Sequence, residues 1–293
     1  MKSLQKLFRR YRVPPDAPFR LKRYDPADTA GLNYEKHRAE KILANGVERL
    51  RVLQDKLYAQ DRRSLLVIFQ AMDAAGKDGT INHVMSGVNP QGVRVHSFKA
   101  PSDEELDHNY LWRVARHLPE RGCIGIFNRS HYEEVLVVRV HPEILASQRL
   151  PRELVTKDFW RERYEDINAF EKHLVRNGTV ILKFFLNVSK TEQKKRLLAR
   201  LDDPHKNWKF SSQDAAERGL WKDYLRAYED AIDATSTKRA PWYVVPADHK
   251  WFTRIVVAET IIQTLSDLDL AYPEIDAKKR RELARVRREI ART

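Results

Sequence analysis

The sequence predicts an α/β fold in which a parallel β-sheet is covered by helices on both faces. Five short apolar runs are rich in β-branched and aromatic residues, and segments with helical periodicity separate them. Nearly continuous apolar strands that alternate with helices are typical of parallel sheets with two buried faces. The expected strands are residues 65–69, 93–98, 123–127, 180–186 and 242–245.

Helices are expected in the segments around these strands. From Leu106 to Leu118 apolar residues recur about every four positions, as on one face of a helix, so the sequence predicts a helix over 103–118. The other expected helices are residues 34–58, 159–175, 190–201, 215–232 and 252–268.

The chain is expected to form one main domain with two appendages. Residues 1–30 are predicted to be an extended arm, 31–270 the α/β domain, and 271–293 a basic helix. Inside the domain, a polar turn with a proline separates two helical segments, which predicts a mobile helical lid at about residues 203–226. A solvated helical hairpin is the alternative interpretation of that segment.

The net charge of +13 comes entirely from the two ends of the chain. Residues 1–23 contribute +7 and residues 278–293 contribute +6, whereas residues 24–277 hold 38 basic and 38 acidic side chains. Any polyanion site in the centre must therefore arise from local clustering. The run at 278–292 is either a solvated helix face or a helix that gathers polyanions, and it lacks aromatic residues that stack on bases.

The remaining composition predicts a cytoplasmic protein with no membrane partner. No apolar run approaches the roughly 20 residues of a membrane-spanning helix. The single cysteine, Cys123, cannot form an intrachain disulfide, which suits a reducing compartment.

The most informative motif follows the first expected strand. Residues 64–82 read SLLVIFQAMDAAGKDGTIN, in which an apolar strand leads into a loop with Gly76, Lys77 and Gly79. Such a loop offers backbone N–H groups and a lysine to phosphate. Asp73 would repel phosphate unless a cation lies between them, so the motif predicts a Mg²⁺-dependent phosphoryl transferase. The alternatives are a glycine-containing turn, with Asp73 as a helix cap.

Each side chain of this loop has an expected role. Lys77 would neutralise the transferring phosphoryl group, and Gly76 and Gly79 would let backbone N–H groups approach it. Asp73 would hold Mg²⁺ or orient the attacking acceptor. Asp78 is either a second metal or water contact or an ordinary carboxylate in the first turn of a helix.

A second motif follows the third expected strand, at residues 122–134, which read GCIGIFNRSHYEE. The strand ends in Asn128, where a Walker B strand usually ends in Asp, so the metal would depend more on Asp73. Arg129 suits a phosphate clamp because its planar fork bonds two oxygens at once. The alternative is a surface arginine that pairs with Glu133.

Longer stretches of the sequence resemble a known family. They read QAMDAAGKDGTINHVMSGVNPQG, FKAPS, FNRSHYEEVLV, ILKFFLNVSKTEQKKRL and APWYVVPADHK. These motifs resemble polyphosphate kinase family 2, and are most similar to its class III branch, which acts on nucleoside mono- and diphosphates. The resemblance runs from about residue 8 to residue 270.

The resemblance implies a thymidylate-kinase-like P-loop kinase fold with a five-stranded parallel sheet and a helical lid. It implies transfer of phosphoryl groups between inorganic polyphosphate and AMP, ADP or other nucleotides with Mg²⁺, or alternatively Mn²⁺, by a homo-oligomer (a dimer or tetramer) without a specific nucleic-acid partner. Asp73 would be the catalytic carboxylate and metal ligand, Lys77 the P-loop lysine and Arg129 the clamp. Phosphate and polyphosphate would bind at Ala75, Gly76, Lys77, Asp78, Gly79, Lys99, Arg196, Arg200, Lys206, Lys209 and Arg218. The nucleotide would bind at Asn128, Arg129, His131, Glu133 and Glu134.

Two other functions are compatible with these residues. An ATP-dependent kinase of a small molecule would use the same loop, because a fold does not fix its substrate. The net charge also allows a non-enzymatic protein that binds nucleic acid, although the charge-balanced centre and the phosphate loop favour an enzyme.

Overall fold

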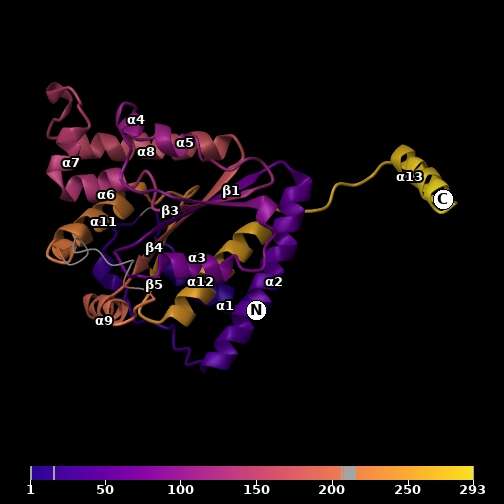
Figure 1. Cartoon of the computed structure of the whole chain (residues 1–293), viewed down its shortest axis with the longest axis horizontal. Coiled ribbons are helices and arrows are strands. Elements are labelled where there is room, and N and C mark those ends of the chain that lie inside the picture. The colour runs from indigo at the N-terminus through magenta and orange to yellow at the C-terminus, as the bar shows by residue number, and fades with distance from the viewer. Residues whose placement is uncertain (1, 16, 206, 208–215, 293) are drawn as a thin grey trace.

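The computed structural model of the chain describes residues 2–15, 17–205, 207 and 216–292 (Figure 1). Five parallel strands form one sheet in the order β2-β3-β1-β4-β5. Their bounds are Ser64–Gln70 for β1, Val93–Ser97 for β2, Ile124–Asn128 for β3, Thr179–Asn187 for β4 and Trp242–Pro246 for β5. The five predicted strands are therefore confirmed, each to within one residue at either end.

The strand register brings the ends of the central strands together. Phe69 of β1 lies opposite Asn128 of β3 and Phe184 of β4. Because all strands are parallel, the loops that leave β1 and β3 emerge at the same edge of the sheet. The two motifs that the sequence singled out are thus neighbours in space.

Helices cover both faces of the sheet (Figure 1). Helix α12 packs on one face with α1, α2 and α3 around it, and α6, α8 and α11 form a layer on the other. The helices before the third strand are α1 (Lys2–Phe8), α2 (Lys36–Gln60), α3 (Lys77–Val84), α4 (Asp103–Leu106) and α5 (Trp112–Ala115). Those after it are α6 (Glu133–Val140), α7 (Pro142–Ser147), α8 (Phe159–Arg176), α9 (Lys190–Leu201), α11 (Trp221–Thr235), α12 (Lys250–Ser266) and α13 (Ala277–Ile290).

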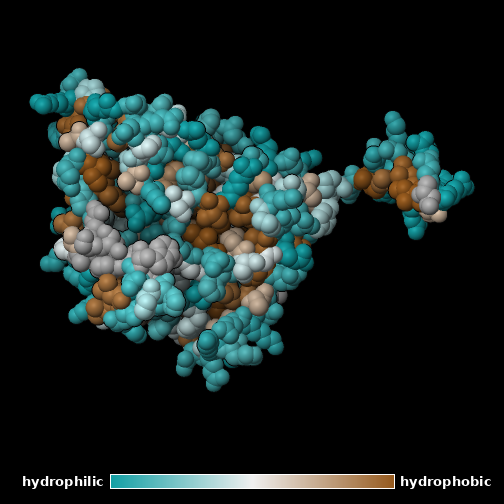
Figure 2. Space-filling view, in the orientation of Figure 1, coloured by the Kyte–Doolittle hydropathy of each residue, from teal (hydrophilic) through white to brown (hydrophobic). Residues whose placement is uncertain are grey.

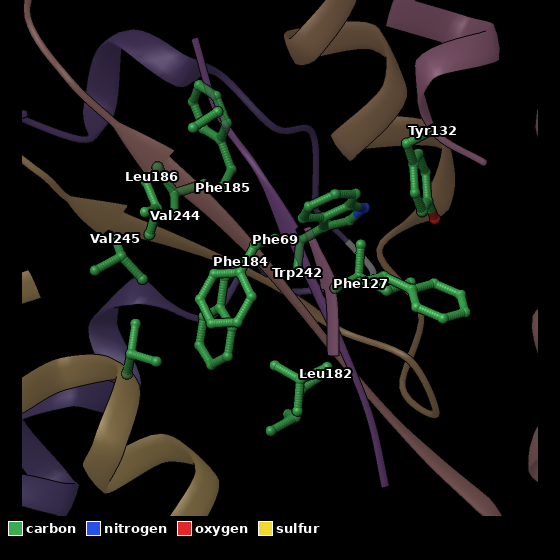
Figure 3. Close-up of a cluster of buried hydrophobic side chains, with 14 of the residues drawn as sticks. Phe69, Phe127, Tyr132, Leu182, Phe184, Phe185, Leu186, Trp242, Val244 and Val245 are labelled. Atoms are coloured by element: carbon green, nitrogen blue, oxygen red, sulfur yellow. The ribbon is translucent and has the colours of Figure 1, made fainter. Parts of the chain in front are cut away.

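Aromatic and branched side chains of the strands form the core between these layers (Figure 3). Phe69 stacks on Phe184 with 5.3 Å between ring centroids. Tyr132, which follows β3, meets Trp242 of β5 edge to face at 4.8 Å. Burial of each large side chain stabilises the fold by roughly 1.5–3 kcal/mol, so this cluster holds the strand ends in fixed positions.

A charged network lies inside the layer of α6, α8 and α11. The side chain of Lys183 on β4 is fully inaccessible, and its ammonium donates to Glu171 Oε2 at 2.6 Å, to Tyr132 Oη at 2.9 Å and to the Thr235 carbonyl at 2.8 Å. All three of its donors are satisfied, as a buried charge requires. The network ties α8 and α11 to the residues that follow β3.

Several expectations about helices were wrong in detail. The helix expected over 103–118 is interrupted between α4 and α5, because the Asn109 side chain accepts from the Leu111 N–H and turns the chain. In the segment expected as a helix over 215–232, residues 218–220 form a turn, and α11 begins only at Trp221.

The two appendages differ from each other. The first 30 residues were expected to be extended but include helix α1, and they bury Phe8, Tyr11 and Val13 against the domain. The segment 271–293, which was expected to be a basic helix, contains α13, and α13 stands away from the body (Figure 1). The domain boundaries and the lid remain predictions. No helix in the described part of the chain is long and apolar enough to cross a bilayer.

Candidate active site

The loop after β1 forms a tight turn that leads into α3. Ala74 has φ 58° and Gly76 has φ 105°, so both adopt the left-handed conformation, which costs energy for alanine but not for glycine. Gly76 caps α3, and its carbonyl accepts from the Thr80 N–H at 2.9 Å. The helix N-terminus and its free N–H groups therefore face the opening of the loop, as an anion site requires.

The turn after β3 places an arginine against this loop. Arg129 has φ 65°, and its backbone N–H donates to the Phe69 carbonyl at 3.0 Å. Its guanidinium donates to Asp73 Oδ1 at 3.0 Å and to Glu133 Oε2 at 3.4 Å. The pKa of Arg129 is raised, first by Glu133 and also by Asp73. The pair with Glu133 considered from the sequence is present, and it lies beside Asp73.

Lys77 is buried at the floor of the loop. Its ammonium donates to the Ala71 carbonyl at 2.9 Å. Burial, and after it the positive charge of Arg129, lower the pKa of Lys77 to about 8, although Asp73, Glu133 and Asp78 oppose the shift. An incoming phosphate would favour the charged form of this lysine.

The oxygen donors at the loop are compatible with Mg²⁺. Asn128 Nδ2 donates to Asp78 Oδ1 at 2.8 Å, and Asn128 Oδ1 is buried without a hydrogen-bond partner in the described structure. No group of three His, Cys, Asp or Glu residues that could hold a metal occurs among the described residues. Mg²⁺ usually binds one or two carboxylates plus substrate phosphates, so Asp73, with Asp78 and Asn128 near the same loop, fits that ion.

Helix α9 holds the loop from its other side. The Arg196 guanidinium donates to the carbonyls of Ala74 and Ala75 at 3.2 and 2.8 Å, and to that of Ala247 at 2.6 Å. Gln193 Nε2 donates to the Asp73 carbonyl at 3.0 Å. The observed contacts of Arg196 are thus with the loop backbone, and the phosphate contact predicted for it stays a prediction.

The residues predicted for the nucleotide lie in and beside α6. Glu133 accepts from Gln70 Nε2 at 3.0 Å. Glu134 is buried and accepts from Arg163 Nε at 3.0 Å and Gln148 Nε2 at 2.7 Å, and burial raises its pKa. The His131 ring is also buried, 3.6 Å from Glu171 Oε1, and burial lowers its pKa.

A large cleft of about 2080 Å³ opens over both motifs. Figure 2 shows apolar side chains gathered in the middle of this face, between hydrophilic surroundings. The predicted residues from Asp73 to Gly79 and from Asn128 to Glu134 line the cleft, apart from Tyr132, and so do Lys99, Arg196 and Arg200. Arg218 is not among the lining residues and donates instead to Gln193 Oε1 at 2.6 Å. Lys206 and Lys209 lie outside the described residues.

The cleft also contains residues that the sequence analysis missed. Lys250 and Arg254 line it from the first turns of α12, and Tyr110 and Phe170 line it from the opposite layer. Lys250 and Arg254 follow the end of β5, and ligands of parallel sheets bind at the ends of strands. Their position in the sequence could therefore have predicted them. The ring of Tyr110 lies under the Arg163 guanidinium at 4.8 Å, a contact that no sequence spacing indicates.

Comparisons with known proteins identify the family. The profile of the family described as Polyphosphate kinase 2 (PPK2) matches residues 33–272. The chain belongs to this family. A solved structure of polyphosphate kinase 2 from Arthrobacter aurescens TC1 matches with a TM-score of 0.84 and 44% identity, over 94% of each chain. This likeness confirms the P-loop kinase fold expected from the resemblance.

Two curated relatives cover nearly the whole length. An ADP-polyphosphate phosphotransferase of Rhodopseudomonas palustris is 54% identical over 87% of this chain and 89% of its own length. An AMP/ADP-polyphosphate phosphotransferase of Meiothermus ruber is 49% identical over 91% of this chain and 96% of its own. Membership of the polyphosphate kinase 2 family makes this chain a phosphotransferase.

Proposed function

We propose that this protein transfers a phosphoryl group between inorganic polyphosphate and AMP or ADP, with Mg²⁺, by in-line displacement at the loop 71–79. The names of the two relatives give the substrates. The structural support is a division of the cleft into two unlike sides that meet at Asp73, Lys77 and Arg129.

The side formed by α9 and α12 is cationic. Among the residues of these two helices that line the cleft, four are cationic and none is a carboxylate. Arg254 is half-buried, and its guanidinium has no hydrogen bond or ion pair with any residue that the structure describes. A Cβ placed on Gly79 would lie 3.9 Å from Arg254 Nη2, so this guanidinium sits beside the start of α3. Burial without a partner costs free energy, and a linear polyanion would supply one.

The opposite side suits a nucleotide. Some of its charged side chains pair with one another, as Glu134 does with Arg163, and the aromatic rings of Tyr110 and Phe170 also line the cleft there. A base has a flat apolar face that stacks on aromatic rings and polar edges that need a few fixed partners. The nucleotide would lie here with its terminal phosphate toward Arg129.

The residues where the two sides meet would carry the transfer. In-line phosphoryl transfer depends on positioning and on neutralising the charge of the equatorial oxygens. Lys77 and the N–H groups of α3 would hold the transferring group, and Arg129 would bond two of its oxygens. Asp73 would be the principal ligand of Mg²⁺, which when bound would offset the negative charge of the phosphate oxygens.

The test is a coupled assay with purified full-length protein. Long-chain polyphosphate with AMP or ADP and Mg²⁺ should yield ADP and ATP, and EDTA should abolish the product. Transfer from ATP to a non-nucleotide acceptor, with polyphosphate inert, would replace this proposal by a small-molecule kinase. Salt-sensitive binding of nucleic acid without any transfer would indicate a binding protein.

A further inference from the structure

Helix α13 carries four cations on one face, and none of them belongs to the active site. Lys278, Arg281, Arg285 and Arg288 are separated by three or four residues, so they share one face of the helix and extend over about 15 Å. We call these four residues the cationic stripe. All four are exposed. The family match ends at residue 272, so the stripe lies outside the matched region.

The helix does not contribute to the core of the domain. None of the residues Ala277–Ile290 is buried, and α13 stands clear of the body in Figure 1. The segment before it is anchored, since Tyr272 Oη donates to Asp55 Oδ2 of α2 at 2.6 Å. The stripe is therefore tethered to the domain by a short segment and is free to meet a ligand.

We propose that the cationic stripe is a second binding site for inorganic polyphosphate. It would hold a distant part of a polyphosphate molecule whose end lies in the cleft. This inference rests on the proposed function. Charge complementarity carries it: the stripe places four exposed cations on one face over about 15 Å, and polyphosphate bears a negative charge on every unit. Attachment of one molecule at two tethered sites raises its effective concentration at the cleft.

The composition of α13 favours polyphosphate over other polyanions. It contains no aromatic residue, whereas proteins that bind single-stranded nucleic acid stack bases on aromatic rings. The apolar face is confined to Leu283, Val286 and Ile290, without the Trp and Phe residues common in helices that bind membrane surfaces. In Figure 2 this apolar patch is bordered by hydrophilic atoms.

Two matched triple variants test the stripe in the full-length protein. Arg281→Gln, Arg285→Gln and Arg288→Gln remove three stripe charges and the ion pair of Arg285 with Glu289. The control combines Lys279→Gln, Arg280→Gln and Arg287→Gln, which removes three charges from other faces and the ion pair of Lys279 with Glu282. The two variants therefore have the same net charge and each loses one ion pair.

The measured quantity is the ratio of KM for long-chain polyphosphate to KM for a chain of only a few phosphates. We expect the stripe variant to raise this ratio by about fivefold or more, and the control variant to change it by less than about twofold, because its charges lie off the stripe. An equal rise in both variants, or no rise in either, would overturn the proposal.

Direct binding separates this inference from the proposed function. Fluorescently labelled long-chain polyphosphate should bind the wild-type chain more tightly than the stripe variant without any nucleotide, even if no phosphoryl transfer is found. Vesicles of anionic phospholipid or a duplex DNA that binds through the stripe and resists displacement by polyphosphate would overturn the assignment. Failure of transfer with binding intact would reject only the proposed function.

Discussion

The two sides of the cleft differ in whether their buried charged side chains have partners. On the α12 side, Arg254 is half-buried and has no partner among the described residues, and burial lowers its pKa. On the α6 side, the buried carboxylate of Glu134 has a partner on each oxygen. A buried charge without a partner costs more free energy than one that is paired and hydrogen-bonded. This difference supports the proposal that an anion binds on the α12 side and that the α6 side, where Glu134 is already paired, takes the nucleotide.

The largest expected effects are at the junction of the two sides, where a change should impair transfer whichever substrate is limiting. Asp73→Asn and Lys77→Ala should each lower kcat by about 10² or more, as expected for groups that act on the transition state. Rates with ADP and polyphosphate measure this, with Asp223→Asn on the exposed face of α11 as a control. Wild-type turnover in either variant, with a normal melting curve, would reject the assigned roles.

The pH dependence sharpens the role of Lys77. Its pKa of about 8 in the free protein means that the ammonium loses its proton as the pH rises through that value. We expect kcat/KM for polyphosphate to fall about tenfold per pH unit above that point. The kcat profile should fall at higher pH, because bound phosphate favours the charged lysine. At about pH 9.5 Lys77 of the free protein is mostly uncharged. A kcat/KM profile that stays flat up to that pH would show that transfer does not need the charge, and would contradict this role.

A smaller effect is expected at Arg254, and it should be confined to one substrate. Arg254→Gln should raise KM for polyphosphate about tenfold, since a hydrogen bond to a charged group contributes roughly 1.5 kcal/mol. KM for ADP should stay the same. The exposed Arg176 at the end of α8 supplies the control variant Arg176→Gln, which should alter neither constant. If Arg254→Gln left both constants unchanged, the guanidinium would have no contact with the donor.

The smallest effect concerns stability beneath the α6 side. Burial lowers the pKa of His131 in the folded protein below its unfolded value of about 6.5. The unfolded state therefore binds protons more readily as the pH falls below 6.5 or so, and the folded state loses stability there. The free energy of unfolding should fall less steeply between about pH 7 and pH 5 in His131→Gln than in wild type or in the exposed control His173→Gln. The free energy of unfolding is measured by urea titration at each pH. Identical slopes of this free energy against pH in all three proteins would show that His131 does not titrate in this way.

The sequence was sufficient to predict the strands and the two central loops, because buried strands leave continuous apolar runs and parallel strand ends meet at one edge. It did not predict α6, whose residues EEVLVVRV include β-branched side chains that favour strands. The contacts of Arg196 could not be predicted from the sequence either. Whether an arginine on a helix binds phosphate or the loop backbone depends on the rotation of that helix, which tertiary packing sets.

The cleft combines residues that are far apart in the chain. Tyr110 and Arg254 come from separate segments, and neither belongs to a motif with fixed spacing. Arg254 could have been suspected from its place after the last strand. Tyr110 could not, because the sequence places it on the apolar face of a helix expected over 103–118, a position that predicts a core residue.

The most direct test of the two-sided cleft is a comparison of KM values for two variants in one assay. Arg254→Gln should raise KM for polyphosphate and leave KM for ADP unchanged. Tyr110→Leu should raise KM for ADP by about tenfold, as expected for the loss of one base-stacking contact, and leave KM for polyphosphate unchanged. If both variants raised the same constant, or both constants together, the cleft would not be divided between the two substrates and the account would be wrong.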